Sequence, residues 1–239
     1  MTTTATEYAP GLFVRAIAPP LRLAHFGLIA FDMDSTLISI ECVDEIAAAV
    51  GKKPEVAAIT EAAMRGEIAD YKESLRRRVA LLKGTPESAL HTIYTERLRL
   101  NPGVERVVAA CRAAGLHTLL VSGGFTFFSD RVRDRLQIDE TRSNVLEIAD
   151  GRLTGRMVDQ PWGDICDGDE KRRAVLHACE RLGIPSARAI AVGDGANDLP
   201  MMDAVGLSVA YHAKPAVRAR AMVSIVDGGM DRLLEVVRP

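Results

Sequence analysis

The sequence predicts an α/β fold: a parallel sheet flanked by helices, with a small α-helical cap inserted after the first strand and a β-hairpin flap beside the core. Three observations lead to this prediction. Continuous apolar runs end abruptly in polar or glycine-rich loops, a long segment carries helical spacing without intervening strands, and one stretch alternates around Asp-Gly. The 239 residues suffice for one large domain or for a core with an insert.

The composition is that of an ordinary enzyme and argues against several other classes. The formal net charge is −2 with acids and bases interspersed, so neither nucleic acid nor a membrane surface is an expected partner. No apolar stretch approaches the ~20 residues of a membrane span. The start lacks a basic signal region, and the four cysteines show no Cys-x-x-Cys spacing. We expect a cytoplasmic protein with reduced thiols; a homodimer is compatible with the sequence but not required by it.

The first part of the chain predicts an arm, a strand and the cap. Residues 1–25 contain three prolines and no clear period, so we expect an arm that lies on the domain or is partly disordered. The apolar run at 28–31 is continuous, which is typical of a strand buried on both faces. The segment 41–98 is the expected cap, and the core is expected to comprise 26–40 and 99–239. The helical spacing of the cap is shown by the apolar residues Val43/Ile46/Ala47/Val50, Val56/Ile59/Ala63 and Leu75/Val79/Leu82.

The second part predicts alternating strands and helices. We expect Asn101 to cap a helix whose first residue is Pro102, and Gly115 to end that helix. Asp150-Gly151 within an alternating stretch predicts a hairpin. The other expected elements are strands at 118–121, 189–192 and 207–211, a helix at 170–182 closed by Gly183, and a helix at 230–237.

Two carboxylates one residue apart, Asp32 and Asp34, follow the first predicted strand, and folding alone does not require them. The carboxyl ends of strands are where ligands bind in open α/β sheets. Neighbouring carboxylates repel and raise a pKa unless a cation relieves them. Mg²⁺ would do so, since it binds one or two carboxylates together with water and substrate phosphate. The alternative is a turn in which Asp34 caps the next helix and Asp32 is a solvated strand end.

Two further strand ends carry motifs, and together they resemble those of the haloacid dehalogenase (HAD) superfamily. The run at 118–121 ends in Ser122-Gly-Gly124, and that at 189–192 ends in Gly193-Asp-Gly-Ala-Asn-Asp198. The matches are the nucleophile motif at Asp32-Met-Asp34-Ser-Thr, the hydroxyl motif at Ser122, the lysine motif at Lys171 and the metal motif at Asp194, Asn197 and Asp198. The chain is more similar still to members that hydrolyse phosphoserine, which carry FDxDST, LRxRV, VSGGF and GDGANDxxM. The resemblance covers about residues 27–237.

The resemblance implies a HAD-like Rossmannoid core and a Mg²⁺-dependent phosphatase. Its reaction would be the hydrolysis of O-phospho-L-serine to L-serine and phosphate through an aspartyl-phosphate, the closing step of serine biosynthesis. Asp32 would be the nucleophile, and Asp34 the general acid and base, which has to start the cycle protonated. The metal ligands would be Asp32, the backbone carbonyl of Asp34 and Asp194, with Asp198 orienting neighbouring groups.

Four other residues are expected near the phosphoryl group. Ser122 and the Gly123 N–H can donate to phosphoryl oxygens. Lys171 offers a positive charge to Asp32 and to the phosphate, and Asn197 resembles the family's substrate-contacting amide. Some of the expected site residues also have an ordinary explanation: Ser122-Gly-Gly124 could be a plain loop, Lys171 a solvated helix lysine, and Asp194 a turn aspartate.

Substrate specificity is expected to lie in the cap. Glu41 is the candidate for the ammonium group, although a first-turn carboxylate also suits the helix dipole. The run Arg76-Arg77-Arg78 offers three candidates for the carboxylate and could equally be a solvated face. Helical geometry favours Arg78, which flanks the apolar stripe and also matches the family's substrate arginine. Met64 and Tyr71 are expected to wall the pocket, although core packing would explain them nearly as well.

The motifs leave rival functions open. Water and an acceptor hydroxyl attack the same intermediate, so a phosphotransferase passing phosphate from phosphoserine to homoserine has the same motifs. Another small phosphomonoester could be the substrate. A non-catalytic phosphoamino-acid sensor is disfavoured, because a binder needs no nucleophile.

Overall fold

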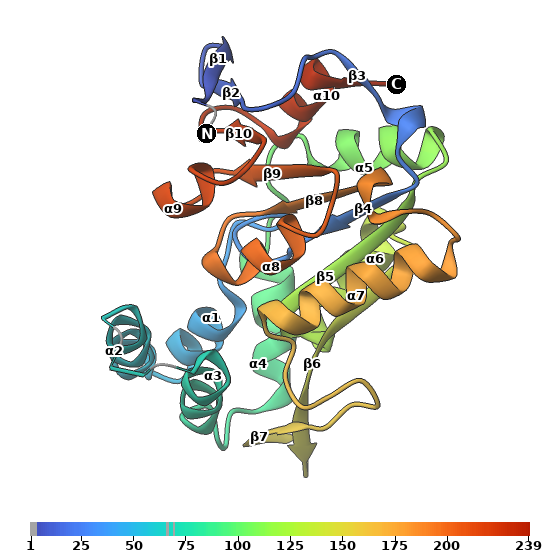
Figure 1. The fold of residues 1–239 in the computed structure, drawn as a ribbon. Coiled ribbons are helices and arrows are strands. Elements are labelled where there is room, and N and C mark those ends of the chain that lie inside the picture. Colours follow the sequence, from blue (N-terminus) through green and yellow to red (C-terminus); the bar gives the residue numbers. More distant parts are fainter. Residues whose placement is uncertain (1–3, 66, 69) are drawn as a thin grey trace.

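The structure is a computed structural model that describes residues 4–65, 67–68 and 70–239. Within them the main sheet has nine strands in the order β1-β2-β10-β9-β8-β4-β5-β6-β7, and helices cover both of its faces (Figure 1). The strands are β1 (Thr6–Ala9), β2 (Leu12–Val14), β4 (Leu28–Phe31), β5 (His117–Phe125), β6 (Glu140–Ala149), β7 (Arg152–Val158), β8 (Ala189–Gly193), β9 (Leu207–Tyr211) and β10 (Val223–Ile225). The predicted α/β fold is confirmed.

The first predicted strand, β4, lies at the centre of the parallel part of the sheet. It pairs in parallel with β5 on one side and with β8 on the other, and β9 and β10 continue the parallel order. Ile29 and Phe31 belong to one hydrophobic cluster and Leu28 and Ala30 to another, and all four side chains are buried. The continuous apolar run therefore reflects burial on both faces, as predicted.

Each face of the sheet has its own helices. The cluster around Ile29 contains residues of α5 (Val104–Ala113), α6 (Thr126–Leu136) and α10 (Leu233–Val236). The cluster around Leu28 contains residues of α7 (Gly168–Arg181), α8 (Leu199–Met202) and α9 (Pro215–Arg218). No helix in the described part of the chain is long and apolar enough to cross a membrane.

The cap consists of helices inserted between β4 and β5. They are α1 (Cys42–Ala49), α2 (Lys53–Met64), α3 (Tyr71–Ala80), α4 (Glu87–Thr92) and the π-helical turn η2 (Ile93–Arg97). Figure 1 shows α1, α2 and α3 gathered beyond one edge of the sheet. Val43, Ile46 and Ala47 are buried, as are Leu75 and Val79, so these predicted apolar stripes face the interior.

The predicted hairpin is formed by the antiparallel strands β6 and β7. Its turn residues Asp150 and Gly151 have φ angles of 51° and 68°. Two consecutive positive φ angles are what a type I′ turn requires, and Asp-Gly adopts them easily. The flap prediction is confirmed.

The amino-terminal arm is more ordered than its prolines suggested. β1 and β2 form a hairpin, and β2 pairs with β10, so the arm extends the main sheet at its edge. A further short strand, β3 (Leu21–Arg22), pairs with β11 (Val237–Arg238). Each of these strands is too short to show a clear period, and the partners that order them come from the far end of the sequence. Residues 1–3 lie outside the described residues.

Two sequence predictions about helix ends were wrong. The helix after Asn101 begins at Val104 with Gly103 as its N-cap, and the Asn101 amide instead donates to the carbonyls of Ser35 (3.3 Å), Thr36 (2.9 Å) and Ile38 (3.1 Å). Asn101 therefore braces the loop after β4 rather than starting a helix.

The second error concerns the carboxy-terminal helix predicted at 230–237. The segment is a 3₁₀ turn (Met230–Arg232) followed by α10, and Val237 already belongs to β11. Val237 pairs with Leu21, a contact that local spacing does not reveal. The helices predicted to end at Gly115 and Gly183 are confirmed, because both glycines follow a helix with positive φ.

Candidate active site

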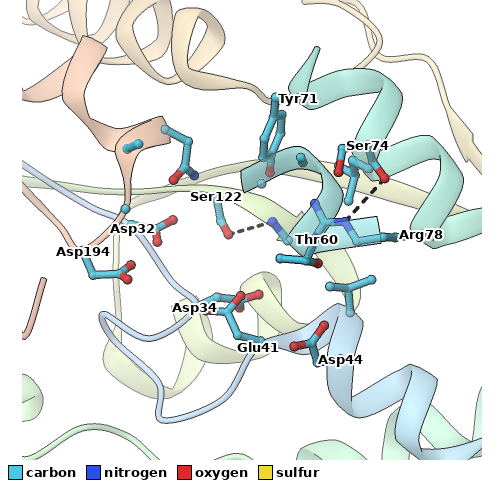
Figure 2. Close-up of a pocket in the computed structure, with 18 of the residues that line it drawn as sticks. Asp32, Asp34, Glu41, Asp44, Thr60, Tyr71, Ser74, Arg78, Ser122 and Asp194 are labelled. Atoms are coloured by element: carbon cyan, nitrogen blue, oxygen red, sulfur yellow. Dashed lines mark hydrogen bonds between the residues drawn. The ribbon is translucent and has the colours of Figure 1, made fainter. Parts of the chain in front are cut away.

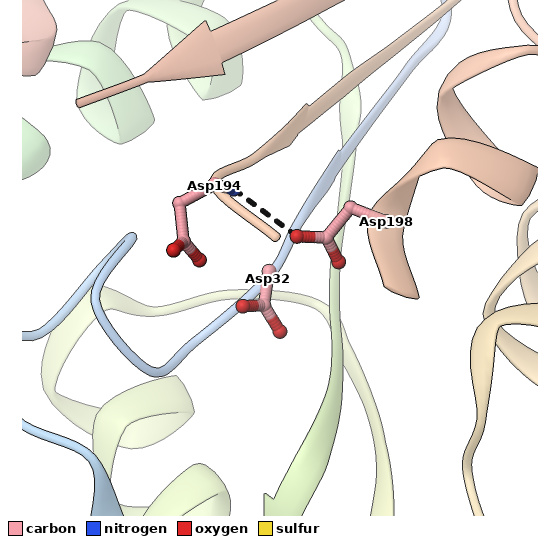
Figure 3. Close-up of side chains that lie close together, drawn as sticks. All are labelled: Asp32, Asp194 and Asp198. Atoms are coloured by element: carbon pink, nitrogen blue, oxygen red, sulfur yellow. Dashed lines mark hydrogen bonds between the residues drawn. The ribbon is translucent and has the colours of Figure 1, made fainter. Parts of the chain in front are cut away.

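Carboxylates from separate strand ends meet at one edge of the sheet. Asp32 follows β4 and Asp194 follows β8; with Asp198 they place carboxylate oxygens within 4.8 Å of one another (Figure 3). Burial and Asp198 raise the pKa of Asp32, while Lys171 opposes the increase. Burial, Asp198 and Glu41 raise the pKa of Asp194 to about 6. Hard oxygen donors that are buried or half-buried and repel one another fit a small divalent cation such as Mg²⁺.

Asp198 differs from the other two because its oxygens are already bound. Oδ2 accepts hydrogen bonds from the backbone N–H groups of Asp194 (3.1 Å) and Gly195 (3.0 Å), and Oδ1 accepts one from Lys171 (2.7 Å). Among the residues that the structure describes, the Asp194 carboxylate has one long side-chain contact, at 3.5 Å from the Thr36 hydroxyl. Asp198 thus holds the loop that carries Asp194, and Asp194 remains open to a ligand.

Lys171, on α7, is completely buried between two of these carboxylates. Its Nζ lies 2.5 Å from Oδ1 of Asp32 and 2.7 Å from Oδ1 of Asp198. Burial alone would lower the pKa of Lys171, but Asp198 and Asp32 outweigh it and raise the pKa, so the side chain stays charged. A solvated helix lysine is thereby excluded.

Asp34 occupies a different environment, at the start of α1. Its Oδ2 accepts the Cys42 backbone N–H at 3.0 Å, and the Cys42 thiol lies 3.1 Å from Oδ1. Burial, with Glu41 as the next cause, raises the pKa of Asp34 to about 7. A carboxyl group with this pKa can both give and take a proton near neutral pH. The turn interpretation of Asp34 captured the contact with the helix start but not this consequence.

The end of β5 supplies a tight loop beside the carboxylates. The Ser122 Oγ accepts the Gly124 N–H at 2.9 Å, which leaves its own proton free to be donated elsewhere. A methyl group added to Gly123 would lie 2.2 Å from the Tyr71 hydroxyl oxygen, and one added to Gly124 would lie 2.9 Å from Met33 Cε. The lack of a side chain at Gly123 lets Tyr71 of the cap approach the core, and the lack of one at Gly124 leaves room for Met33 within the core.

A cavity of about 530 Å³ joins these groups to the cap (Figure 2). It brings together most of the predicted site residues: Asp32, Asp34, Glu41, Arg78, Ser122, Gly123, Asp194 and Asn197. Lys171 and Asp198 lie behind this lining and reach it through Asp32 and the Asp194 loop. Tyr71 also lines the cavity, whereas the side chain of Met64 lies outside the described residues.

The structure separates the three arginines that the sequence left open. Arg76 pairs with Asp164, and Arg77 pairs with Glu73 at 2.7 Å. Arg78 points into the cavity and, within the described residues, forms no ion pair; its Nε lies 3.4 Å from the Ser74 carbonyl. Glu41 is exposed at the same cavity and accepts a hydrogen bond from the Ser35 hydroxyl at 2.6 Å.

Sequence reasoning missed contacts at the site. Thr36, the last residue of the first motif, contacts Asp194, and Cys42, at the start of α1, contacts Asp34. Lys214 lines the cavity and follows β9; it acts to lower the pKa of Asp194. The rule applied to the other strands, that polar residues after a parallel strand face the site, would have found it.

Known proteins are similar to this chain in sequence. A family model for haloacid dehalogenase-like hydrolase matches residues 29–203. The chain is 70% identical over 233 residues to a phosphoserine phosphatase of Polaromonas sp., covering 98% of this chain and 99% of that relative.

Solved structures are similar to this chain in fold as well. A probable phosphoserine phosphatase from Vibrio cholerae in unliganded form superposes with a TM-score of 0.81 at 41% identity, covering 94% of this chain and 67% of that one. A phospho-aspartyl intermediate analogue of phosphoserine phosphatase also gives 0.81, at 33% identity, covering 89% of this chain and 99% of that one. The chain therefore belongs to the haloacid dehalogenase-like hydrolase family, in the group whose members are named phosphoserine phosphatases.

Proposed function

We propose that this protein is a Mg²⁺-dependent phosphatase that hydrolyses O-phospho-L-serine to L-serine and phosphate, the closing step of serine biosynthesis. One observation carries the proposal: two carboxyl groups suited to act as nucleophile and proton donor, the first of them bound to a buried lysine, share a cavity with an anion and a cation of the cap. Phosphoserine has the complementary groups, because it adds an ammonium and a carboxylate to its phosphate.

Asp32 is the proposed nucleophile. Lys171 is bound to its Oδ1, which leaves Oδ2 to attack phosphorus. The bond from phosphorus to the serine oxygen breaks as the aspartyl-phosphate forms, and protonated Asp34 gives its proton to that oxygen. Asp34 then takes a proton from water, which attacks phosphorus, releases phosphate and restores Asp32. A pKa of about 7 suits Asp34 to both halves of this cycle.

Mg²⁺ is the proposed cofactor, held by the carboxylates of Asp32 and Asp194 and by the backbone carbonyl of Asp34. When bound, it would neutralise charge on the phosphoryl oxygens and keep the carboxylates ionised. The raised pKa values of Asp32 and Asp194 support this role, since a cation relieves the repulsion that raises them.

The remaining residues are proposed to bind the substrate. Ser122, the Gly123 N–H, Lys171 and Asn197 would surround the phosphoryl group. Glu41 would bind the ammonium group, and Arg78 the carboxylate through both of its N–H edges. Arg78 is the arginine of its run that lacks a carboxylate partner among the described residues, which supports its choice over Arg76 and Arg77.

A substrate panel tests the function. We expect phosphate release from phosphoserine to exceed that from phosphothreonine, phosphoethanolamine and a neutral phosphate ester, and to disappear when a chelator removes the metal. Equal rates across the panel would contradict the assigned substrate. Product analysis with homoserine added tests the hydrolase against a phosphotransferase: appearance of phosphohomoserine in place of free phosphate would replace the proposed reaction.

A further inference from the structure

The Tyr71 hydroxyl lies where the cap meets the phosphate-side loop. Tyr71 is the first residue of α3, and its ring lines the cavity. Figure 2 shows the ring directed toward the side of the cavity that carries Ser122. Its oxygen is close enough to Gly123 that an added methyl group there would be 2.2 Å away. The hydroxyl is therefore held against the backbone of the loop at the end of β5.

This hydroxyl has no hydrogen-bond partner among the residues that the structure describes. Buried and half-buried polar groups are normally satisfied, so a hydroxyl directed into a binding cavity is available to a ligand. Burial raises the pKa of Tyr71 to about 12, while Lys171 and then Arg78 act to lower it. The group consequently keeps its proton over the working range and can always donate.

The surroundings indicate which ligand group it meets. The hydroxyl touches Gly123, next to Ser122, and the cation with the larger influence on it is Lys171 rather than Arg78. These are the residues proposed to surround the phosphate, whereas Arg78 is assigned to the carboxylate. We propose that the Tyr71 hydroxyl donates a hydrogen bond to a phosphoryl oxygen of the substrate, which makes it a further binding residue contributed by the cap. This inference rests on the proposed function.

Such a bond would couple closure of the cap to the phosphate itself. Glu41 and Arg78 recognise the amino-acid part, but Tyr71 reaches across to the half of the site where the chemistry occurs. A phenylalanine would fill the same space without the bond. The choice of tyrosine at this wall of the pocket thus has a chemical consequence.

The test compares Tyr71→Phe with Tyr94→Phe, which removes a hydroxyl from a half-buried cap tyrosine that stacks near Arg131 and does not line the described cavity. A hydrogen bond to a charged acceptor is worth roughly a tenfold effect or more. For Tyr71→Phe we expect kcat/KM to fall about tenfold on phosphoserine and equally on p-nitrophenyl phosphate. The inhibition constant of inorganic phosphate should rise by the same factor, and Tyr94→Phe should match the parent.

Two results would overturn the inference: unchanged constants in Tyr71→Phe, or a loss confined to phosphoserine, which would assign the hydroxyl to the amino-acid groups. Calorimetric titration of inorganic phosphate into the Mg²⁺-loaded parent and variant gives the same comparison without turnover. An inactive parent would refute the proposed function, while the titration would still decide the role of Tyr71.

A double variant tests the geometry independently of stability. In Gly123→Ala the new methyl meets the hydroxyl oxygen at 2.2 Å, but the next atoms, Tyr71 Cζ and the Cys166 carbonyl, are both at 3.4 Å. Adding Tyr71→Phe removes the clash, so the double variant should bind inorganic phosphate more tightly than Gly123→Ala alone. A double variant no better than Gly123→Ala would show that the hydroxyl does not lie on this loop.

Discussion

The core side and the cap side of the cavity differ in how far their charged side chains are buried and paired. On the core side, Asp32 is 5% exposed and Lys171 and Asp198 are fully buried, and these three are linked by short contacts. On the cap side, Glu41 is exposed, and the Arg78 guanidinium contacts, within the described part of the chain, the Ser74 carbonyl of its own helix at 3.4 Å. The groups proposed for the chemistry are thus held in place by one another, whereas the groups proposed to bind the substrate are left for the substrate to pair with.

Weak ion pairs join α3 of the cap to the segment of the core before α7. Lys72 on α3 lies 2.7 Å from Asp164 and 3.6 Å from Asp167, and Arg76 also pairs with Asp164. The side chains involved are 18–47% exposed, and surface pairs of this kind contribute only about 0–1 kcal/mol each. These ion pairs therefore add little to the free energy that holds the cap against the core.

The largest expected effect comes from removing the nucleophile. Asp32→Asn should reduce turnover of phosphoserine by at least about 10³-fold, because the amide cannot form the aspartyl-phosphate. Circular dichroism should show the parent fold. Normal turnover in this variant would show that the core half does not perform the proposed chemistry.

Removing the buried lysine tests whether the stability of the core side depends on Lys171 neutralising Asp32 and Asp198. Lys171→Met leaves Asp32 and Asp198 buried together without their cation, and breaking a buried pair typically costs about 3–5 kcal/mol. We expect Tm to fall sharply in chelator and to recover in part with Mg²⁺. If Tm falls equally with and without the metal, Lys171 has only a packing role.

Arg78→Ala tests the cap half, with Arg77→Ala as a control because Arg77 pairs with Glu73 within the same helix. Loss of a charged hydrogen bond should raise KM for phosphoserine about 10- to 100-fold, and KM for a neutral phosphate ester much less. Arg77→Ala should leave both unchanged. Equal effects of Arg78→Ala on both substrates would remove it from specificity.

Asp34→Asn tests the proton held at the boundary between the halves. Since burial and Glu41 raise the folded-state pKa of Asp34 to about 7, the folded protein binds this proton more tightly than the unfolded chain. The contribution of Asp34 to stability is therefore fully present below its ordinary pKa near 4 and is lost as the pH rises to about 7. Measured in chelator, Asp34→Asn should be more stable than the parent above pH 7, with the difference vanishing near pH 4. A gain that is equal at every pH would contradict the raised pKa.

The smallest effect is expected at the ion pairs between the halves. Asp164→Asn removes the shared partner of Lys72 and Arg76 and should raise KM for phosphoserine by less than about fivefold. The difference from the parent should shrink at high salt, because exposed pairs are screened. Glu73→Gln breaks a pair within α3 and provides the control. A salt-independent effect of Asp164→Asn would contradict an electrostatic contact.

Much of the fold was predictable because its signals are local. The continuous run of β4 and the Asp-Gly turn between β6 and β7 depend on residues next to one another in the chain. The arm strands β1 and β2 were not predictable, because they are ordered by β10, more than two hundred residues away. Asn101 was assigned to a helix cap for the same reason: its amide is bound by carbonyls of a distant loop.

By itself, the sequence determined which residues could do the chemistry, because the motifs at Asp32, Ser122, Lys171 and Asp194 each follow from a few adjacent positions. Only the tertiary structure decided how they act together. In the structure Asp198 binds Lys171, whereas the Asp194 carboxylate is open to a ligand. Arg76 and Arg77 form ion pairs, and Arg78 forms none among the described residues. The Tyr71 hydroxyl lies against Gly123. The physical reason is that pKa values and hydrogen-bond partners depend on burial and on neighbours through space, which the order of residues along the chain does not contain.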